Sequence, residues 1–332
     1  MSRVLRFVVG RLLSMVVGLL VISLVTFAVF TLVPADPAQL SCGRPCTPQS
    51  LDLVRAYLGL DNPWFVRYLL FLQGIVAGRM YGAGATAVRC AAPCFGYSFQ
   101  QHASVASLIA SRIPVTFSLV AGAAVIWLVV GVGAGVVSAM RHGTIVDRML
   151  MASVTVGMST PLYLLALLAI LLFGFELNVV PTGGYVPLTE DPLGWAWHLV
   201  LPWLVLASVS AAIYTRLTRN QMLDVLSEDF IRMARARGVP ERTVISRHAL
   251  RNALLPVVTV FGLDLGSLLG GAVITEHVFS LPGLGGLLMD AVGDLDLPVL
   301  LGCTLFAAFL IIVANFVVDV LYGVLDPRIR LS

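Results

Sequence analysis

Side chains that could carry out chemistry are few and widely separated in this chain of 332 residues. An enzyme needs a cluster of catalytic groups, and a metal site needs ligands at short, regular spacings. The histidines meet neither condition, since they are His102, His142, His198, His248 and His277. They therefore predict no catalytic residue and no metal site.

ATP binding by a phosphate-binding loop is excluded, because all 21 basic residues are arginine. The phosphate-binding loop of ATPases needs a lysine that reaches the phosphates, and this chain has no lysine. The glycine-rich run GVGAG at 131–135 lies inside an apolar stretch, where small residues let two helices approach closely. We therefore expect no cofactor in this chain, and any use of ATP must come from a partner.

Positive charge is concentrated in residues 229–256, which hold six arginines. This stretch has the signals of two consecutive helices. Ser227 is placed to cap the first helix, Gly238 to close it, and Pro240 to begin the second at its first helical position. The predicted apolar face of the first helix comprises Phe230, Met233 and Ala234.

Three explanations compete for this stretch: a nucleic-acid-binding surface, a solvated loop and a docking element. Nucleic acid is disfavoured because a helix–turn–helix module must be free to dock, whereas both ends of this stretch continue into apolar segments. A solvated loop explains the charge but neither the paired helix ends nor the apolar face. An apolar face on a surface helix favours a partner groove or the membrane surface.

The composition places the chain in a membrane, since 58% of its residues are hydrophobic and only 12% are charged. Soluble proteins average about 25% charged residues. The first apolar run is too long for a cleaved signal peptide, so we expect a retained anchor. We predict an all-α integral membrane protein, a single transmembrane domain over 1–332, with six transmembrane helices at 12–33, 115–140, 149–175, 199–215, 254–274 and 299–324.

The arginines also predict the orientation, because cytoplasmic loops of membrane proteins are enriched in basic residues. Fifteen of the 21 arginines fall in the segments 1–11, 141–148, 216–253 and 325–332, which lie on one side of the predicted spans. We therefore expect both ends of the chain in the cytoplasm. The segment 34–114 is then a long extracytoplasmic segment between the first and second helices.

This extracytoplasmic segment contains four cysteines in two pairs, each with three residues between the cysteines. Disulfides persist on the oxidising side of the membrane. Free thiols and a four-cysteine metal site are the alternatives, although structural zinc more often uses a two-residue spacing. Two short amphipathic helices are predicted at 52–60 and 64–78. The disulfide candidates are Cys42, Cys46, Cys90 and Cys94.

One carboxylate, Asp264, lies near the middle of the fifth predicted span. Charged groups within a membrane are costly and are often functional. Asp264 could line a transport pathway and meet the amino terminus of a peptide. It could instead be a protonated or hydrogen-bonded residue at the interface with a companion subunit, and the sequence leaves both alternatives open.

A resemblance to a known family accounts for the arginine-rich stretch. The run ARARG at 234–238, followed by HALRNALLP at 248–256, resembles the EAA loop of the membrane subunits of ABC importers, and more narrowly the dipeptide and oligopeptide permease B-type subunits. The resemblance extends over essentially the whole chain. Further matching motifs are LVPADPA (32–38), LGLDNPWFVRY (58–68), RIPVTFSL (112–119), HVFSLPGLGGLL (277–288) and LYGVLDPRIR (321–330).

The resemblance implies a type I ABC importer permease fold and a docking mechanism. The loop 216–253 would be a cytoplasmic coupling loop that sits in a cleft of an ATPase subunit and transmits its movement to the spans. Arg232 stands where the family has its glutamate, so contacts made by that glutamate do not carry over to this chain. The expected ATPase-coupling residues are Arg232, Ala234, Arg235, Gly238 and Glu241.

The resemblance also implies partners and a location. The partners would be a homologous six-span permease subunit, two ABC ATPase subunits that bind ATP and Mg, an extracytoplasmic substrate-binding protein, a peptide substrate and membrane lipid. The location would be the bacterial plasma membrane. Alternatives are import of nickel, haem or glutathione by the same architecture, or an ion-coupled secondary transporter, which would show internal repeats or several carboxylates within its spans.

Overall fold

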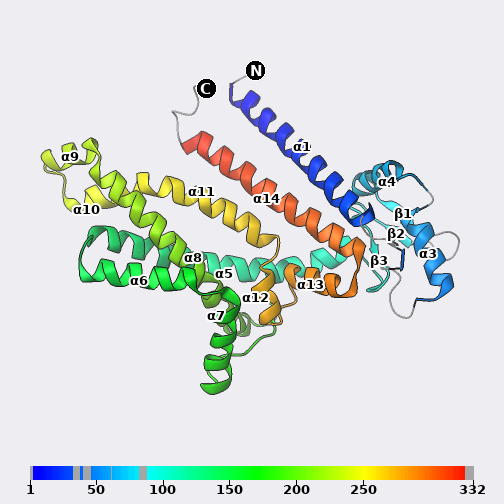
Figure 1. Ribbon diagram of the computed structural model, residues 1–332. Helices are drawn as coiled ribbons and strands as arrows, with labels where there is room; N and C mark the ends of the chain where they lie inside the picture. Colours follow the sequence, from blue (N-terminus) through cyan, green and yellow to red (C-terminus); the bar gives the residue numbers. More distant parts are fainter. Residues whose placement is uncertain (1–2, 33–37, 40–45, 61, 82–87, 326–332) are drawn as a thin grey trace. The chain divides into compact units, whose positions relative to one another are not determined.

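The computed structural model describes residues 3–32, 38–39, 46–60, 62–81 and 88–325 (Figure 1). Five helices within these residues are long and apolar enough to cross a membrane, or six when one bent helix pair is counted as a single span. The predicted fold class, an all-α integral membrane protein, is confirmed. The chain divides into two compact units, the first formed by residues 1–116, 266–273 and 282–332, and the second by 117–265 and 274–281.

The first unit is built on two long apolar helices, α1 (Arg3–Leu32) and α14 (Leu297–Leu325), which pack side by side. A shorter helix, α4 (Trp64–Ala77), packs against the later half of α1. These three helices share one buried apolar cluster, because their contacting faces carry large hydrophobic side chains. The buried members of that cluster are Phe27, Phe71, Leu301 and Leu305.

The segment 34–114 contributes small elements to the same unit. Helix α3 (Pro48–Leu58) starts at a capping box formed by Thr47 and Ser50, and it ends at Gly59 in the left-handed conformation. Two antiparallel strand pairs follow α4. The strands are β1 (Arg79–Tyr81) with β2 (Val88–Cys90), and β3 (Tyr97–Ser98) with β4 (Ala103–Ser104).

This segment is joined to the residues that precede α14. The buried Asp296 carboxylate accepts a hydrogen bond from the Ser98 hydroxyl, and Gln100 Nε2 donates to the carbonyl oxygen of Asp294 at 2.8 Å. Asp294 is the last residue of α13 (Leu284–Asp294). Burial raises the pKa of the Asp296 carboxyl.

The second unit contains most of the remaining helices. Helix α5 (Val105–Met140) begins in the first unit and continues through the second. Its glycines allow close packing on α8: a Cβ atom at Gly131 would lie 3.0 Å from the Ala211 carbonyl oxygen, and one at Gly135 would lie 2.8 Å from that of Thr215. The other elements are α6 (Ile145–Ser159), α7 (Leu162–Ala169), η2 (Ile170–Glu176), α8 (Pro192–Ser227), α9 (Asp229–Ala236), α10 (Glu241–Thr243), η3 (Val244–Ala249), α11 (Leu250–Leu269) and α12 (Val273–Val278).

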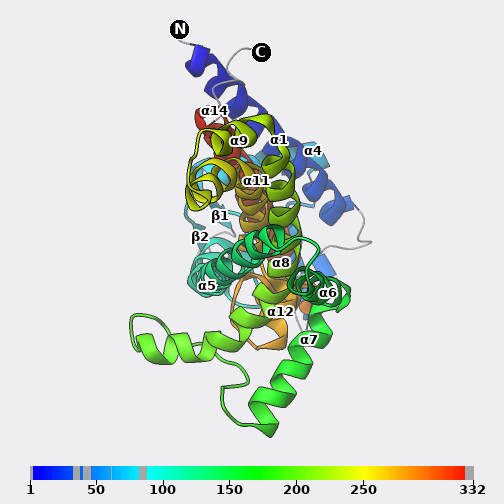
Figure 2. The same ribbon diagram turned by 90° about the vertical axis from the view of Figure 1, so that its left-hand side faces the viewer.

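Several helices differ from the apolar runs read in the sequence. Helix α5 begins ten residues before the expected 115. The expected run 149–175 is a pair of helices bent by 99°, because Pro161 interrupts the helix between α6 and α7 (Figure 2). Helix α11 ends at Leu269, five residues before the expected 274, and Gly271 follows with φ 135°.

Helix α8 shows the largest difference, since it runs over 36 residues where an apolar run of 199–215 was expected. It begins earlier because Asp191 caps it, accepting a hydrogen bond from the Leu193 amide at 3.1 Å, and Pro192 occupies its first turn. It also continues past the apolar run to Ser227. One face of this polar part is still buried, with Thr218 and Met222 on it, so packing supports the helix there.

Candidate functional site

The arginine-rich stretch folds as two helical segments joined by a tight turn. Helix α9 ends at Ala236, and Gly238 then adopts φ 76°, the left-handed conformation expected of the residue that closes a helix. Two details of the sequence reading were wrong by one residue. Glu228, not Ser227, is the N-cap of α9, because α8 extends through Ser227, and Pro240 is the N-cap of α10 and not its first helical residue.

A buried apolar cluster holds this turn against α8 and α5. Ile231 of α9 and Val244 of η3 are fully buried, and they pack with Met222 of α8 and Ala139 of α5. Ala234 packs against the same cluster and is partly buried. We call this set, together with Ala249 and Ala253, the anchoring cluster.

The predicted apolar face of α9 is divided in the structure. Phe230, Met233 and Ala234 were predicted to share a face suited to a partner groove or the membrane surface; Phe230 and Met233 are 43% and 54% exposed, whereas Ala234 is partly buried. The residue that anchors the helix is Ile231, which lies between them in the sequence and points to the other side. The reason is that α9 has two apolar faces, and only one of them meets α8. The exposed face is left available to a partner.

Charged side chains bridge the turn at its surface. Arg235 Nε and Nη2 donate to the two carboxylate oxygens of Glu241 at 3.1 and 2.7 Å, so the pair joins α9 to α10 across Gly238. These hydrogen bonds raise the pKa of Arg235. Arg232 lies 3.3 Å from the Asp229 carboxylate and also donates to the Ser227 carbonyl oxygen at 3.1 Å. The turn thus has a fixed backbone and an exposed, positively charged rim.

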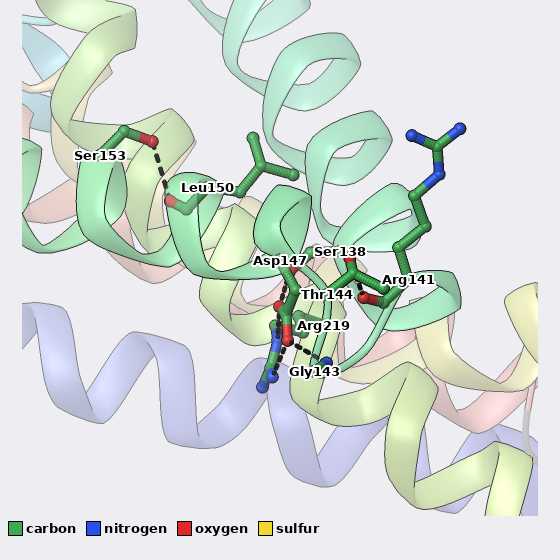
Figure 3. Close-up of polar contacts among 8 residues, drawn as sticks. All are labelled: Ser138, Arg141, Gly143, Thr144, Asp147, Leu150, Ser153 and Arg219. Atoms are coloured by element: carbon green, nitrogen blue, oxygen red, sulfur yellow. Dashed lines mark hydrogen bonds and ion pairs between the residues drawn. The ribbon is translucent and has the colours of Figure 1, made fainter.

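A second ionic cluster fastens α8 about two turns before its end at Ser227 (Figure 3). Arg219 of α8 donates to Asp147 of α6 through Nε at 2.7 Å and Nη2 at 2.9 Å. The same carboxylate accepts from the Ser138 hydroxyl of α5 at 2.5 Å and from the Gly143 amide at 2.9 Å. One buried aspartate therefore joins the end of α5, the start of α6 and the C-terminal half of α8.

Sequence reasoning did not find this ionic cluster. The available signal was weak: Asp147 is the single acidic residue of the predicted loop 141–148, where the other charges are arginines. Nothing in the spacing of the chain pairs it with Arg219, because 72 residues separate them. Their meeting depends on α6 packing along α8.

Asp264 has a partner within its own unit. The Tyr214 hydroxyl of α8 donates to the Asp264 carboxylate of α11 at 2.8 Å. The tyrosine ring lies against Trp127, which in turn contacts Phe261 at a centroid distance of 6.1 Å. Asp264 is half-buried in this aromatic group. A hydrogen-bonded aspartate is one of the two alternatives considered from the sequence, and a pathway role stays a prediction.

The cysteines of the segment 34–114 belong to the first unit. Cys90 and Cys94 are joined by a disulfide, so their sulfur atoms are not available to a metal. Cys46 is also disulfide-bonded, and Cys42 lies outside the described residues. Cys303 of α14 is a buried free thiol. Among the residues that the structure describes, no group of three or more histidine, cysteine or acidic side chains could hold a metal ion.

Comparisons with known proteins agree with this architecture. Residues 131–331 match the family model of the binding-protein-dependent transport system inner membrane component, and residues 4–120 match the model of its N-terminal part. The MetNI methionine ABC transporter in an inward-facing conformation has a similar fold, with a TM-score of 0.52 and 17% identity over 67% of this chain and 97% of that chain.

Two relatives extend the similarity along the sequence. A protein of Brucella abortus (strain 2308), named as a peptide transport system permease protein, is 40% identical over 93% of this chain and 94% of its own length. The dipeptide transport system permease protein DppB of Escherichia coli K12 is 36% identical over 98% of this chain and 99% of its own length. The chain is a multi-pass membrane permease component and belongs to the family of binding-protein-dependent transport system inner membrane components.

Proposed function

We propose that this chain is the membrane-spanning permease subunit of an ATP-driven importer of di- and oligopeptides. The observation that carries the proposal is the turn at Gly238, where an exposed apolar face and an arginine rim are presented on a helix that the anchoring cluster joins to α8 and α5. The relatives named for peptide and dipeptide transport support the substrate class.

The remaining parts of the importer are supplied by partners in this proposal. A homologous six-span permease subunit completes the translocation pathway, and a substrate-binding protein delivers the peptide from outside. Two ATPase subunits bind ATP and Mg and carry out hydrolysis, so this chain is not an enzyme. Six spans, formed by α1, α5, the bent pair α6–α7, α8, α11 and α14, leave both ends in the cytoplasm of the bacterial plasma membrane.

The coupling contacts are assigned to the turn between α9 and α10. Arg232, Arg235, Gly238 and Glu241 are exposed and are proposed to meet the ATPase. Ala234 is proposed to contribute through its small side chain, which lets α9 lie close to the anchoring cluster. An apolar pair on an exposed helix face is stabilised by entering a groove, so the exposed Phe230 and Met233 are added to the proposed contact.

The mechanism follows from how the turn is held. When the ATPase subunits close on ATP, they displace α9. Because Ile231 is buried against Met222 and Ala139, α9 cannot move without α8 and α5. The ionic cluster of Asp147, Arg219 and Ser138 adds α6 to the same moving part. The displacement therefore reaches several spans at once and reorients the pathway.

The test is reconstitution of the complete transporter in proteoliposomes. We expect the chain to co-purify with a second permease and two ATPase subunits, and ATP hydrolysis to rise when the binding protein carries a di- or oligopeptide. Stimulation by nickel, haem or glutathione in place of peptides would refute the substrate class. Uptake driven by an ion gradient without ATP would refute the importer itself.

A pathway role for Asp264 is proposed separately. A carboxylate that is half-buried, with one hydroxyl partner, keeps acceptor capacity for the ammonium group of a peptide. Asp264→Asn should then lower uptake of peptides with a free amino terminus, while uptake of an N-acetylated peptide changes less. Tyr214→Phe is the matched control, because it removes the partner of Asp264 and leaves its charge. Unchanged uptake in Asp264→Asn would leave only the structural role.

A further inference from the structure

The extracytoplasmic segment contains two helices of different character. Helix α3 carries Asp52 and Arg55 and begins at a polar capping box. Helix α4 has a single charged residue, Arg67, in the sequence WFVRYLLFLQGIVA. Its inner face packs on α1 and α14 through Tyr68, Phe71, Leu72 and Ile75.

The other face of α4 is apolar apart from Gln73, and it is uncovered within the described residues. Phe65, Leu69 and Val76 fall at helical spacing on one stripe, and the side chains of Leu69 and Val76 are 61% and 81% exposed. Trp64 begins the helix and contacts the ring of Phe65. Such a stripe is unfavourable in water, because each large apolar side chain left exposed forgoes the transfer free energy that its burial would supply.

The depth of α4 is fixed by its contacts with α1. The Tyr68 hydroxyl lies 2.7 Å from the Ser23 hydroxyl and donates to the Leu20 carbonyl oxygen at 3.2 Å. The apolar span of α1 reaches at least Val29 within the described side chains, six residues beyond Ser23 and nine beyond Leu20. At 1.5 Å per residue these contacts lie at least about 9 and 14 Å inside the end of the span. Half of the hydrocarbon core is about 15 Å thick, so Tyr68 reaches toward the middle of the membrane.

The contacts with α14 agree with this depth. Leu301 and Leu305 share the cluster with Phe71 of α4, and they lie four and eight residues after the start of α14 at Leu297. Beyond the end of α4, the Cys94 amide donates to the Gly74 carbonyl oxygen at 3.2 Å, and the disulfide hairpin follows. Helix α4 therefore lies beside the outer ends of two spans, at hydrocarbon depth.

We propose that α4 is a lateral helix embedded in the leaflet that surrounds the C-terminal end of α1, with its exposed stripe in contact with lipid acyl chains. With the N-terminus in the cytoplasm this is the outer leaflet. The side chains favour lipid over another helix, because helix interfaces in membranes are enriched in small residues and this stripe holds Phe, Leu and Val. The single glycine of α4, Gly74, instead lies on the buried side.

The consequence is that the segment 34–114 does not stand wholly in the aqueous compartment. One of its helices is held in the membrane, and α3 with the strand pairs is tethered close to the bilayer surface. The inference does not depend on the substrate that the chain transports. It depends only on α1 crossing the membrane.

Photo-cross-linking tests the proposal in the complete transporter, reconstituted in vesicles of phosphatidylethanolamine and phosphatidylglycerol. Benzoylphenylalanine replaces Leu69 or Val76, and Gln49 of α3 is the exposed control position on the same segment. After illumination, mass spectrometry should find acyl-chain adducts at positions 69 and 76. It should find none at position 49.

Two outcomes would overturn the proposal. Adducts between these positions and another protein chain would make the stripe a subunit interface. Adduct levels no higher than at position 49 would place α4 in water. Two separate positions on the stripe guard against one variant that fails to assemble, and equal recovery of the three variants in the membrane fraction is the control for folding.

Discussion

Two arginine–carboxylate pairs in the second unit have the same chemistry and different surroundings. Arg219 holds Asp147 at 2.7 Å with side chains 16% and 6% exposed, whereas Arg235 holds Glu241 at 2.7 Å with side chains 43% and 56% exposed. The first pair has two further donors, from Ser138 and Gly143, and joins three helices. The second pair spans a single turn.

The difference separates a part that holds the fold from a part that faces a partner. A buried carboxylate deprived of its arginine leaves an uncompensated charge, so the first pair is costly to break. An exposed pair is solvated whether or not it is formed, so it contributes little to stability. The exposed pair can therefore be exchanged for contacts with another subunit at little cost to the chain. Substitutions at the buried pair should lower the stability, whereas substitutions at the exposed pair should affect contacts with the partner.

The largest effect is expected from breaking the buried pair. Asp147→Asn should destabilise the chain by about 3 kcal/mol, the lower end of the range for removing one partner of a buried ion pair. Thermal unfolding of the purified transporter should show a lower Tm and less folded protein in the membrane. Glu241→Gln is the matched control and should leave the Tm unchanged. Equal Tm values for both variants would contradict the comparison.

A second large effect is expected at the anchoring cluster. Ile231→Ala removes a fully buried side chain and should cost about 2–3 kcal/mol of stability, whereas Met233→Ala, two residues later and exposed, should cost almost none. Met233→Ala should instead weaken co-purification with the ATPase subunits. The measurement is the Tm of each variant together with the amount of ATPase retained. If Met233→Ala lowered the Tm as much as Ile231→Ala, α9 would not have two distinct faces.

The turn itself should tolerate only residues that adopt a positive φ. No atom lies within 4 Å of a Cβ built at Gly238, so Gly238→Val acts through backbone strain, about 1–2 kcal/mol, and not through a clash. The variant should insert normally, but its ATP-driven uptake should fall about tenfold. A strain of about 1.4 kcal/mol lowers the population of the native turn about tenfold. Gly238→Asn should retain most uptake, because asparagine tolerates this conformation. Normal uptake in Gly238→Val would remove the turn from the coupling path.

The smallest effect is expected from exchanging the charges of the exposed pair. Arg235→Glu combined with Glu241→Arg preserves the bridge across Gly238 and reverses the sign at each position. Stability should not change. If the ATPase contacts these side chains, peptide-stimulated ATP hydrolysis should fall in the double variant, whereas full activity would show that only the bridge matters. The single variant Glu241→Gln measures the loss of the bridge alone.

Sequence patterns predicted the helical turn well because its signals are local. Gly238 closes α9 where the sequence placed it, since a glycine at that position relieves a conformational restriction that involves only its own backbone. The compartment favoured disulfides among the four cysteines of 34–114 but left their pairing open, and the structure pairs the neighbours Cys90 and Cys94. Both features depend on residues close together in the chain.

Features that depend on packing could not be read in the same way. Choosing between Phe230 and Ile231 as the buried residue of α9 requires knowing where α8 lies, and α8 itself extends beyond its apolar run. The Asp147–Arg219 pair joins positions 72 residues apart, and no periodicity connects them. The run 149–175 was predicted as one span although it contains Pro161, and the 99° bend between α6 and α7 depends on the helices around it. Long-range partners are therefore what the sequence left undetermined.

The length of α8 determines how the ionic cluster at Arg219 would transmit a movement along the helix. From Arg219 to the end of the helix at Ser227 is about 12 Å, and from Arg219 back to Trp203, just after Pro202, is about 24 Å. When the joined helices α5, α6 and α8 rotate about a point near Arg219, a movement at Ser227 is accompanied by a displacement about twice as large at Trp203. The position of one arginine along α8 thus sets how far the other end of the helix moves for a given movement at the turn between α9 and α10.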